Sequence, residues 1–300
     1  MIAKHMLRNI KEEIYKYIFM AIAFSSLIFL FGIIIVLFKN GIPLFKDFSI
    51  SSVLFGKYWY PTYEPAEFGM LPLILGSLWI TIGALFVCVP LGVGSALYIH
   101  EIASYRQRMW LKPSIEILAA VPSIVYGFFG MVIVAPFLQK LFGIPVGLCA
   151  FTASLILGVM ATPTVCSITE DALGYVPKTF KEASLAIGAN RWQTLVHVVI
   201  PAAGSGISTA IILGISRAIG ETMTVLMVAG GAAVIPKSFF QPVRPMTATI
   251  AAEMGEAVVG SGHFHALFSI GLILFLTTLV FNVIAEIISK KYRLKLGFGR

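Results

Sequence analysis

The stretch "TFKEASLAIGANRWQTLVHVVIP", residues 179–201, joins a short helical pattern to the start of a long apolar run. Thr179 and Glu182 form a T-x-x-E pattern, which predicts a capping box at a helix N-terminus. Gly188 predicts the end of the same helix, because glycine readily adopts the left-handed conformation that terminates helices. A helix of about two and a half turns is too short to be stable alone. We therefore expect it to pack against another surface.

The sequence on both sides of this stretch is strongly apolar. The 300-residue chain is 58% hydrophobic and has a mean hydropathy of +0.91. Only 12% of its residues are charged, against about 25% in soluble domains. These properties predict an integral membrane protein. The net charge of +8 fits basic cytoplasmic loops, and no nucleic-acid-binding motif accompanies it, so we expect no nucleic-acid partner.

Six apolar segments are close to the ~20 residues that a membrane-spanning helix needs. We predict helices because an open sheet leaves backbone groups unsatisfied in lipid. The chain is therefore expected to be all-α and polytopic. The predicted spans are residues 18–38, 71–99, 115–138, 148–169, 203–229 and 264–288.

The distribution of Lys and Arg predicts the orientation. With the N-terminus inside, the cytoplasmic segments hold 15 of the 22 Lys and Arg residues and the external segments hold six. This bias places both termini in the cytoplasm. The predicted organisation is an N-terminal part (1–70), a core (71–290) with a cytoplasmic loop (170–202), and a basic tail (291–300).

The external segment 39–70 is expected to act as a lid, a docking surface or a connector. Its Tyr58, Trp59, Tyr60 and Tyr63 form a cluster typical of an aromatic belt at the membrane interface.

Few residues suggest chemistry or a bound metal. Cys88, Cys149 and Cys166 lie in apolar runs and are expected to be small buried hydrophobes. His263 and His265 are interpreted as an interfacial pair, since no third ligand lies near them. The chain has no phosphate-binding G-x-x-x-x-G-K-[ST] loop. It is therefore expected to bind no cofactor and to have no ATPase site of its own.

The loop at 179–201 resembles the EAA loop of ABC importer permeases. The family pattern is E-A-A-x3-G-x9-I-x-L-P, and the matching residues run from Glu182-Ala183-Ser184 through Gly188 to Pro201. Ser184 replaces the second Ala, and Ile200 replaces Leu. The resemblance implies a coupling helix that docks on an ATPase subunit through Glu182, Ala183 and Gly188. The alternative is a short amphipathic connector.

Segments 76–101, 116–130 and 216–231 resemble PstC-type permeases of phosphate-specific transporters. This resemblance implies a type I (MetI-like) importer fold in the inner membrane of a prokaryote. It further implies a second, PstA-like permease, a PstB-like ATPase dimer that binds ATP and Mg, and a PstS-like phosphate-binding protein outside. The expected mechanism is alternating access. The alternatives are the same machinery with another oxyanion or small solute, or an ion-coupled secondary transporter with Glu221 as the proton carrier.

The fifth predicted span carries two charges. Gly214, Arg217, Glu221 and Thr224 are expected to share one helix face. Each charge at mid-bilayer costs ~2.5–3.5 kcal/mol, which an Arg217–Glu221 ion pair would partly offset. The pair is interpreted as a structural lock, as an anion path in which the planar guanidinium of Arg217 binds phosphate, or as a gate. The family resemblance implies a role in translocation.

Other acidic residues lie near the predicted membrane faces. Glu170 and Asp171 are interpreted as a solvated helix end or as a contact to a partner. Glu253 and Glu256 are expected to meet either water or a delivering binding protein. The small residues of the second span are interpreted as packing positions. They are Gly76, Gly83, Gly92, Gly94 and Ala96.

Overall fold

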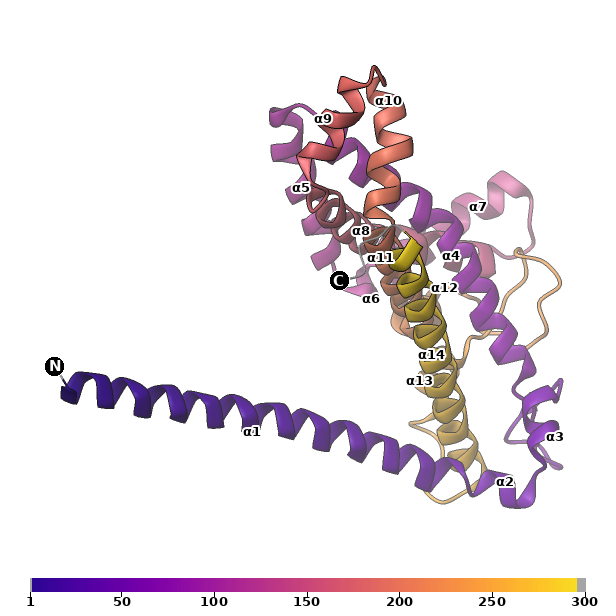
Figure 1. Ribbon diagram of the computed structural model, residues 1–300. Helices are drawn as coiled ribbons and strands as arrows, with labels where there is room; N and C mark the ends of the chain where they lie inside the picture. The colour runs from indigo at the N-terminus through magenta and orange to yellow at the C-terminus, as the bar shows by residue number, and fades with distance from the viewer. Residues whose placement is uncertain (1, 296–300) are drawn as a thin grey trace.

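The computed structural model describes residues 2–295 and is almost entirely helical (Figure 1). Six described segments are long and apolar enough to cross a membrane, which confirms the predicted number of spans. These segments are Glu13–Asp47, Leu71–Ile102, Ser123–Phe142, Ala150–Gly174, Arg191–Gly220 and Gly262–Ile287.

The helices vary in length from single turns to long rods. They are α1 (Ile2–Gly41), α2 (Leu44–Asp47), α3 (Ile50–Phe55), α4 (Leu71–Leu97), α5 (Tyr105–Ala120), α6 (Ser123–Phe129), α7 (Ala135–Phe142), α8 (Ala150–Gly174), α9 (Lys178–Ala186), α10 (Arg191–Thr194), α11 (Ile200–Gly220), α12 (Met223–Val228), α13 (Met246–Glu253) and α14 (Gly262–Lys295). Three π-helical turns join them, η1 (Tyr98–Ile102), η2 (Gly130–Val134) and η3 (Leu195–Val199). Two short antiparallel strands, β1 (Trp59–Tyr60) and β2 (Glu67–Phe68), form a hairpin.

Helices α4 and α8 form the centre of the bundle and approach each other closely. A Cβ added at Gly158 would lie 2.5 Å from the Cβ of Val87, and one added at Gly92 would lie 2.7 Å from the Cβ of Val165. Small residues allow such approach between membrane helices, so the predicted packing role is confirmed for Gly92. It is wrong for Gly94, where an added Cβ would meet nothing within 4 Å.

The third span begins later than predicted. The expected segment 115–138 is divided at Val121, where the backbone is extended (φ −65°, ψ 127°) and α5 ends. The residue before a proline is driven out of the helical region by the proline ring, and Pro122 follows. As a result, α5 is a separate helix and the span runs over Ser123–Phe142.

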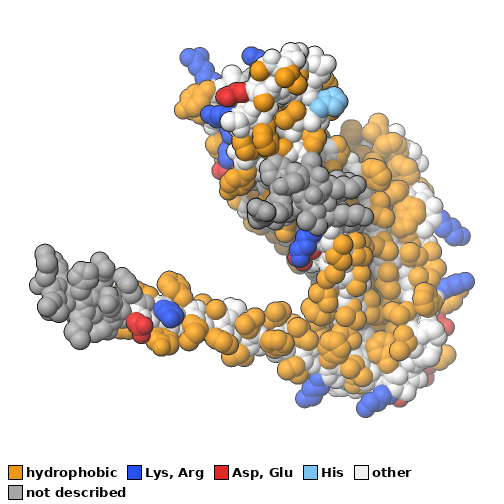
Figure 2. All heavy atoms as spheres, viewed as in Figure 1, with side chains coloured by type: hydrophobic (Ala, Val, Ile, Leu, Met, Phe, Trp, Pro, Cys, Tyr) orange, Lys and Arg blue, Asp and Glu red, His pale blue; other side chains and the backbone are white. Residues whose placement is uncertain are grey.

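Helix α1 leaves the bundle and contacts it only near its own C-terminal end (Figure 1). There the ring of His265 lies 2.7 Å from the carbonyl of Asn40, and the Ser269 hydroxyl donates to the carbonyl of Gly41 over 2.6 Å. Large apolar side chains are exposed on α1 from Ile14 to Phe38 (Figure 2). In a membrane, these exposed side chains face lipid or another subunit.

Helices α2 and α3 and the β-hairpin form the end of the bundle opposite α9 (Figure 1). Trp59 is only 3% exposed and belongs to a buried cluster with Phe68, so the prediction that it is part of an interfacial belt is wrong. Tyr58, Tyr60 and Tyr63 remain exposed, with ring centroids 6.1 Å and 5.0 Å apart along the stack. The hairpin explains the difference, because successive strand residues point to opposite faces.

The predicted division into three parts stays a prediction. Of the predicted basic tail 291–300, residues 291–295 belong to α14, and residues 296–300 lie outside the described residues.

Candidate functional site

The helix that carries Arg217 ends inside the predicted fifth span. Helix α11 stops at Gly220, Glu221 is extended (φ −71°, ψ 130°), and α12 begins at Met223. The prediction of one continuous helix over 203–229 is therefore wrong. The predicted common face for Gly214, Arg217, Glu221 and Thr224 fails for the same reason. Glycine has a low helix propensity, and a basic residue in the last turn with a glycine at the end, as Arg217 and Gly220 provide, is typical of a helix C-terminus.

Arg217 and Glu221 have different surroundings. Arg217 lies in the last turn of α11, where a cation interacts favourably with the helix dipole. Its Nε is buried and has no hydrogen-bond partner among the described residues. The Glu221 carboxylate instead accepts from the backbone N–H of Thr224 over 3.2 Å. The expected Arg217–Glu221 ion pair is absent from the part of the chain that the structure describes.

Thr224 joins the break to two other helices. Its hydroxyl donates to the carbonyl of Ser123 over 3.0 Å and lies 3.6 Å from the sulfur of Met160. On the other side of the break, the Thr247 hydroxyl donates to the carbonyl of Glu221 over 2.8 Å. The Thr247 contact satisfies the Glu221 carbonyl, which the interrupted helix leaves open, as irregular backbone at membrane depth requires.

A small pocket lies beside the break. The hydroxyl-bearing residues among its lining are Ser77, Thr81 and Thr247, together with the carboxylate-bearing Glu221. Ser77 accepts from the backbone N–H of Met246 over 2.9 Å, which fixes the start of α13 against α4. The site is thus a polar cluster formed by α4, α11, α12 and α13 within an apolar bundle. None of these partners could be deduced from local sequence spacing.

The loop at 179–201 contains the predicted short helix with one difference at its start. Helix α9 begins after Pro177, and no side chain caps it. The predicted capping box of Thr179 and Glu182 is wrong because proline places the first turn earlier, so that Thr179 lies within the helix. The predicted end is confirmed, since Gly188 has φ +91°.

The C-terminus of α9 forms a Schellman motif. The N–H of Gly188 donates to the carbonyl of Leu185 over 3.0 Å, and the N–H of Ala189 donates to the carbonyl of Ser184 over 3.2 Å. Ser184 also bonds the Thr194 hydroxyl over 3.0 Å, and this bond is buried. A serine at this position of the EAA pattern therefore joins α9 to α10.

The outer surface of the loop is exposed. Glu182, Ala183 and Gly188 are all exposed. Ile187 is 86% exposed and Trp192 is 68% exposed. Large exposed apolar groups next to a polar rim are typical of protein interfaces.

Glu170 is buried rather than solvated. Its side chain is 5% exposed and lies 2.7 Å from both the Arg108 guanidinium and the Lys112 ammonium. The interpretation of Glu170 as a solvated helix end is therefore wrong. The hydrogen bond to Glu170 raises the pKa of the Lys112 ammonium above its ordinary value. The two cations come from α5, 58 to 62 positions earlier in the chain, so no local pattern predicts them.

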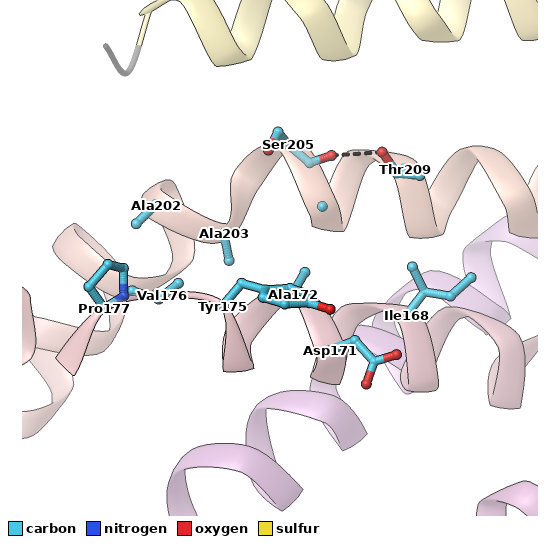
Figure 3. Close-up of a pocket in the computed structure, with 11 residues that line it drawn as sticks. Ile168, Asp171, Ala172, Tyr175, Val176, Pro177, Ala202, Ala203, Ser205 and Thr209 are labelled. Carbon is cyan, nitrogen blue, oxygen red and sulfur yellow. Dashed lines mark hydrogen bonds between the residues drawn. The ribbon is translucent and has the colours of Figure 1, made fainter. Parts of the chain in front are cut away.

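Asp171 has the opposite setting to Glu170. It is exposed and lines a groove between the end of α8 and the start of α11 (Figure 3). Ala172, Ala203 and Gly206 narrow the groove, and Ser205 and Thr209 provide hydroxyls. The groove lies immediately before α9, because Pro177 is also part of its lining.

Glu253 is the centre of a second ionic cluster at the α3 end of the bundle. Its carboxylate lies 2.6 Å from Arg244 and 2.9 Å from His263, and it accepts from the indole of Trp59 over 3.1 Å. It therefore joins α13, α14 and the hairpin. The prediction that Glu253 meets either water or a delivering binding protein is wrong. Glu256 is exposed.

The histidines and cysteines have structural partners. His263 binds Glu253, so it is not paired with His265. All three cysteines are free and buried, as predicted. Among residues 2–295, no group of three or more His, Cys, Asp or Glu side chains is arranged to hold a metal ion.

Comparison with known proteins gives a family match over most of the chain. The sequence profile described as "binding-protein-dependent transport system inner membrane component" matches residues 88–294. The probable ABC transporter permease protein YqgH of Bacillus subtilis is 37% identical over 233 residues, covering 78% of this chain and 75% of that protein. The phosphate transport system permease protein PstC of Mesorhizobium japonicum is 36% identical over 285 residues, covering 89% of this chain and 86% of that protein.

A third relative extends over nearly the whole length. The PstC protein of Haemophilus influenzae is 32% identical over 300 residues, covering 93% of each chain. Solved structures share the fold at lower identity. The inward-facing MetNI methionine ABC transporter gives a TM-score of 0.60 at 19% identity, covering 77% of this chain and 99% of that chain. A bacterial alginate ABC transporter gives a TM-score of 0.64 at 15% identity, covering 92% of this chain and 94% of that chain.

Proposed function

The chain belongs to the family of binding-protein-dependent transport system inner membrane components, and we propose that it translocates inorganic phosphate inward as one subunit of an ATP-driven importer. It is a multi-pass inner-membrane permease subunit and not an enzyme. Phosphate is proposed because relatives named PstC phosphate permeases are 30–36% identical to it and align over most of its length.

The proposed pathway rests on the surroundings of Arg217. A buried guanidinium nitrogen without a partner retains an unmet demand for a hydrogen-bond acceptor. Ionisable residues at membrane depth usually mark a substrate path. A phosphate oxygen satisfies this demand, because guanidinium groups bind oxyanions with charge-assisted hydrogen bonds. We assign Arg217 the role of anion contact in the pathway.

Glu221 and Thr224 support the pathway in a different way from the ion pair expected from the sequence. The Glu221 carboxylate holds the N–H of Thr224, and Thr224 holds the start of α6. Because a carboxylate near the path repels phosphate, it limits the residence time of the anion at Arg217. The extended backbone at Glu221 is also the point at which the two helical halves can change their relative position.

Docking of an ATPase is assigned to α9. The exposed Glu182, Ala183 and Gly188 lie on or directly after this helix, and Ile187 presents an exposed apolar side chain between them. The proposed complex contains a second permease, two ATPase subunits that bind ATP and Mg, and an external phosphate-binding protein. We place α9 and both termini in the cytoplasm, as the Lys and Arg distribution favours.

ATP dependence follows from the charge of the substrate. Moving one negative charge into a cell against 100 mV, inside negative, costs ~2.3 kcal/mol. A passive path would therefore conduct phosphate outward. Alternating access driven by ATP avoids this, since ATP binding closes the ATPase subunits and α9 carries their movement to the pore.

Reconstitution of the chain with its co-encoded permease, ATPase and binding protein tests the proposal. We expect uptake of labelled phosphate only with ATP, and loss of uptake in Gly188→Pro, because proline cannot adopt φ +91°. Gly94→Ala is the matched control, since its Cβ meets open space.

The other outcomes identify the alternatives. ATPase activity that is stimulated by the binding protein without phosphate uptake would retain the machinery and assign another oxyanion or small solute. Uptake by the chain alone without ATP would indicate a secondary transporter.

A further inference from the structure

Two polar side-chain contacts join the docking helix α9 to two different membrane spans. The Ser184 hydroxyl bonds Thr194, which leads into α11. The Lys181 ammonium forms an ion pair with Glu101 in η1, the turn that continues α4. The docking helix is therefore attached both to the span that follows it and to a span that precedes it by 80 residues.

The Lys181–Glu101 pair is partly shielded from water. The two side chains are 26% and 18% exposed, and His100 lies 3.6 Å from the same carboxylate oxygen. An ion pair with this degree of shielding is screened less by salt than a surface pair. It is thus able to transmit a displacement of α9 to the end of α4.

Helix α4 reaches from this pair to the polar cluster beside Glu221. Ser77 and Glu101 belong to one uninterrupted helical segment, Leu71–Ile102, and are separated by about 36 Å at 1.5 Å per residue. At the far end, Ser77 accepts from the N–H of Met246, and the neighbouring Thr247 donates to the carbonyl of Glu221. A continuous set of contacts therefore connects α9 with the helix break.

We propose that the Lys181–Glu101 ion pair couples the docking helix to α4, and that α4 transmits the movement to the backbone at Glu221. This inference rests on the proposed function, since it assigns a route for the coupling of ATP hydrolysis to transport. Lys181 and Glu101 are positioning residues, and neither contacts the anion. Ser184 provides the second attachment, to α11, so that two spans move together when α9 moves.

The test compares four variants in the reconstituted, ATP-driven complex. Lys181→Glu and Glu101→Lys each place like charges together, and the double variant restores an opposite pair. Lys181→Arg keeps the charge. The readout is the number of phosphate ions taken up per ATP hydrolysed, together with co-purification of the subunits. A loss of folding or assembly alone lowers the amount of complex without changing this ratio.

We expect each single reversal to lower the ratio by roughly 5- to 150-fold, the usual range of coupling between sites. The double reversal and Lys181→Arg are expected to restore most of it. Lys178→Glu makes the same charge change on the same helix without an ion-pair partner among the described residues. An equal loss in Lys178→Glu, with no rescue by the double reversal, would show a surface-charge effect and overturn the proposal.

A second measurement tests the route through α4. Ser77→Ala removes the acceptor of the Met246 N–H. If both contacts act through α4, then combining Ser77→Ala with Lys181→Glu lowers the ratio no further than the stronger single change, because sites on one route are not additive. Independent, multiplicative losses would exclude α4 as the route. If the wild-type complex transports phosphate and the Lys181→Glu complex has the same ratio of phosphate to ATP, the proposed link between α9 and α4 is overturned and the proposed function stands. If the wild-type complex shows no ATP-driven uptake, the proposed function is overturned.

Discussion

Removing both cations that face Glu170 is expected to destabilise the chain more than removing Glu170 itself. The Glu170 side chain is 5% exposed, whereas Arg108 and Lys112 are 42% and 41% exposed. A carboxylate left alone in the interior keeps its desolvation cost. Two half-exposed cations left alone regain much of their hydration. The order of the effects therefore follows from the burial of each partner.

The burial also gives the magnitudes. The double variant Arg108→Gln/Lys112→Gln leaves a buried charge without a partner and is expected to cost about 3–5 kcal/mol of unfolding free energy. Each single variant retains one 2.7 Å contact and is expected to cost about 1 kcal/mol. Glu170→Gln conserves the shape and one acceptor and is expected to cost about 1–2 kcal/mol.

Equilibrium unfolding of the purified chain in lipid–detergent micelles, followed by the fluorescence of its four tryptophans, measures these differences. Arg106→Gln is the matched control. It removes an exposed cation from the same helix, and surface changes of this kind usually stay within about 0.5 kcal/mol. A cost for Glu170→Gln equal to that of the double variant would refute the reasoning, because it would mean that leaving the buried carboxylate without partners adds no cost beyond the loss of the ion pairs.

Three other predictions concern transport and packing. Arg217→Gln is expected to abolish ATP-dependent phosphate uptake and leave subunit assembly intact, as measured by labelled phosphate and by co-purification; normal uptake would leave Arg217 only a structural role. Gly158→Ala is expected to lower the free energy of unfolding by about 1–3 kcal/mol, because the new methyl overlaps Val87. Gly94→Ala is expected to be neutral or to raise it by up to about 1 kcal/mol. Equal changes in the free energy of unfolding, measured by denaturation, would contradict the close α4–α8 packing. Gly188→Ala is expected to reduce ATPase-coupled uptake, because φ +91° is strained for alanine by about 1–2 kcal/mol; uptake and ATPase rates of the purified complex check this, and unchanged rates would exclude a fixed α9 terminus.

Local sequence patterns predicted the spans and the end of α9. Six apolar runs and the glycine at 188 are signals that depend only on neighbouring residues, and the structure agrees with both. Boundaries failed where proline acted, at Val121 in the third span and at the start of α9 after Pro177. Pro122 excludes the helical region for Val121 although the apolar run continues through both residues. Pro177 directly precedes the first turn of α9, whereas the T-x-x-E pattern points to a start at Thr179.

The polar contacts could not be predicted because their partners are distant in the chain. Glu170 contacts Arg108, which lies 62 residues earlier in the chain, and Lys181 contacts Glu101, which lies 80 residues earlier. Spacing along one helix predicted an Arg217–Glu221 pair four residues apart, but that spacing brings side chains together only while the helix continues. Gly220, three residues after the basic Arg217, is a local sign that the helix does not continue.

The contacts between helices that the sequence did not predict share a physical cause. Lipid solvates an apolar helix surface as well as another helix does, so burial of apolar area does not select a particular arrangement of spans. The selection falls to close contacts of small residues, as between Gly158 and Val87, and to polar groups at helix ends. Each helix end within the membrane must find partners for its open backbone groups, and at the α11–α12 break these come from Thr247 and the Glu221 side chain. Partners drawn from separate helices move only if those helices move. An interrupted helix is therefore a place where a change at α9 can reach the proposed anion path.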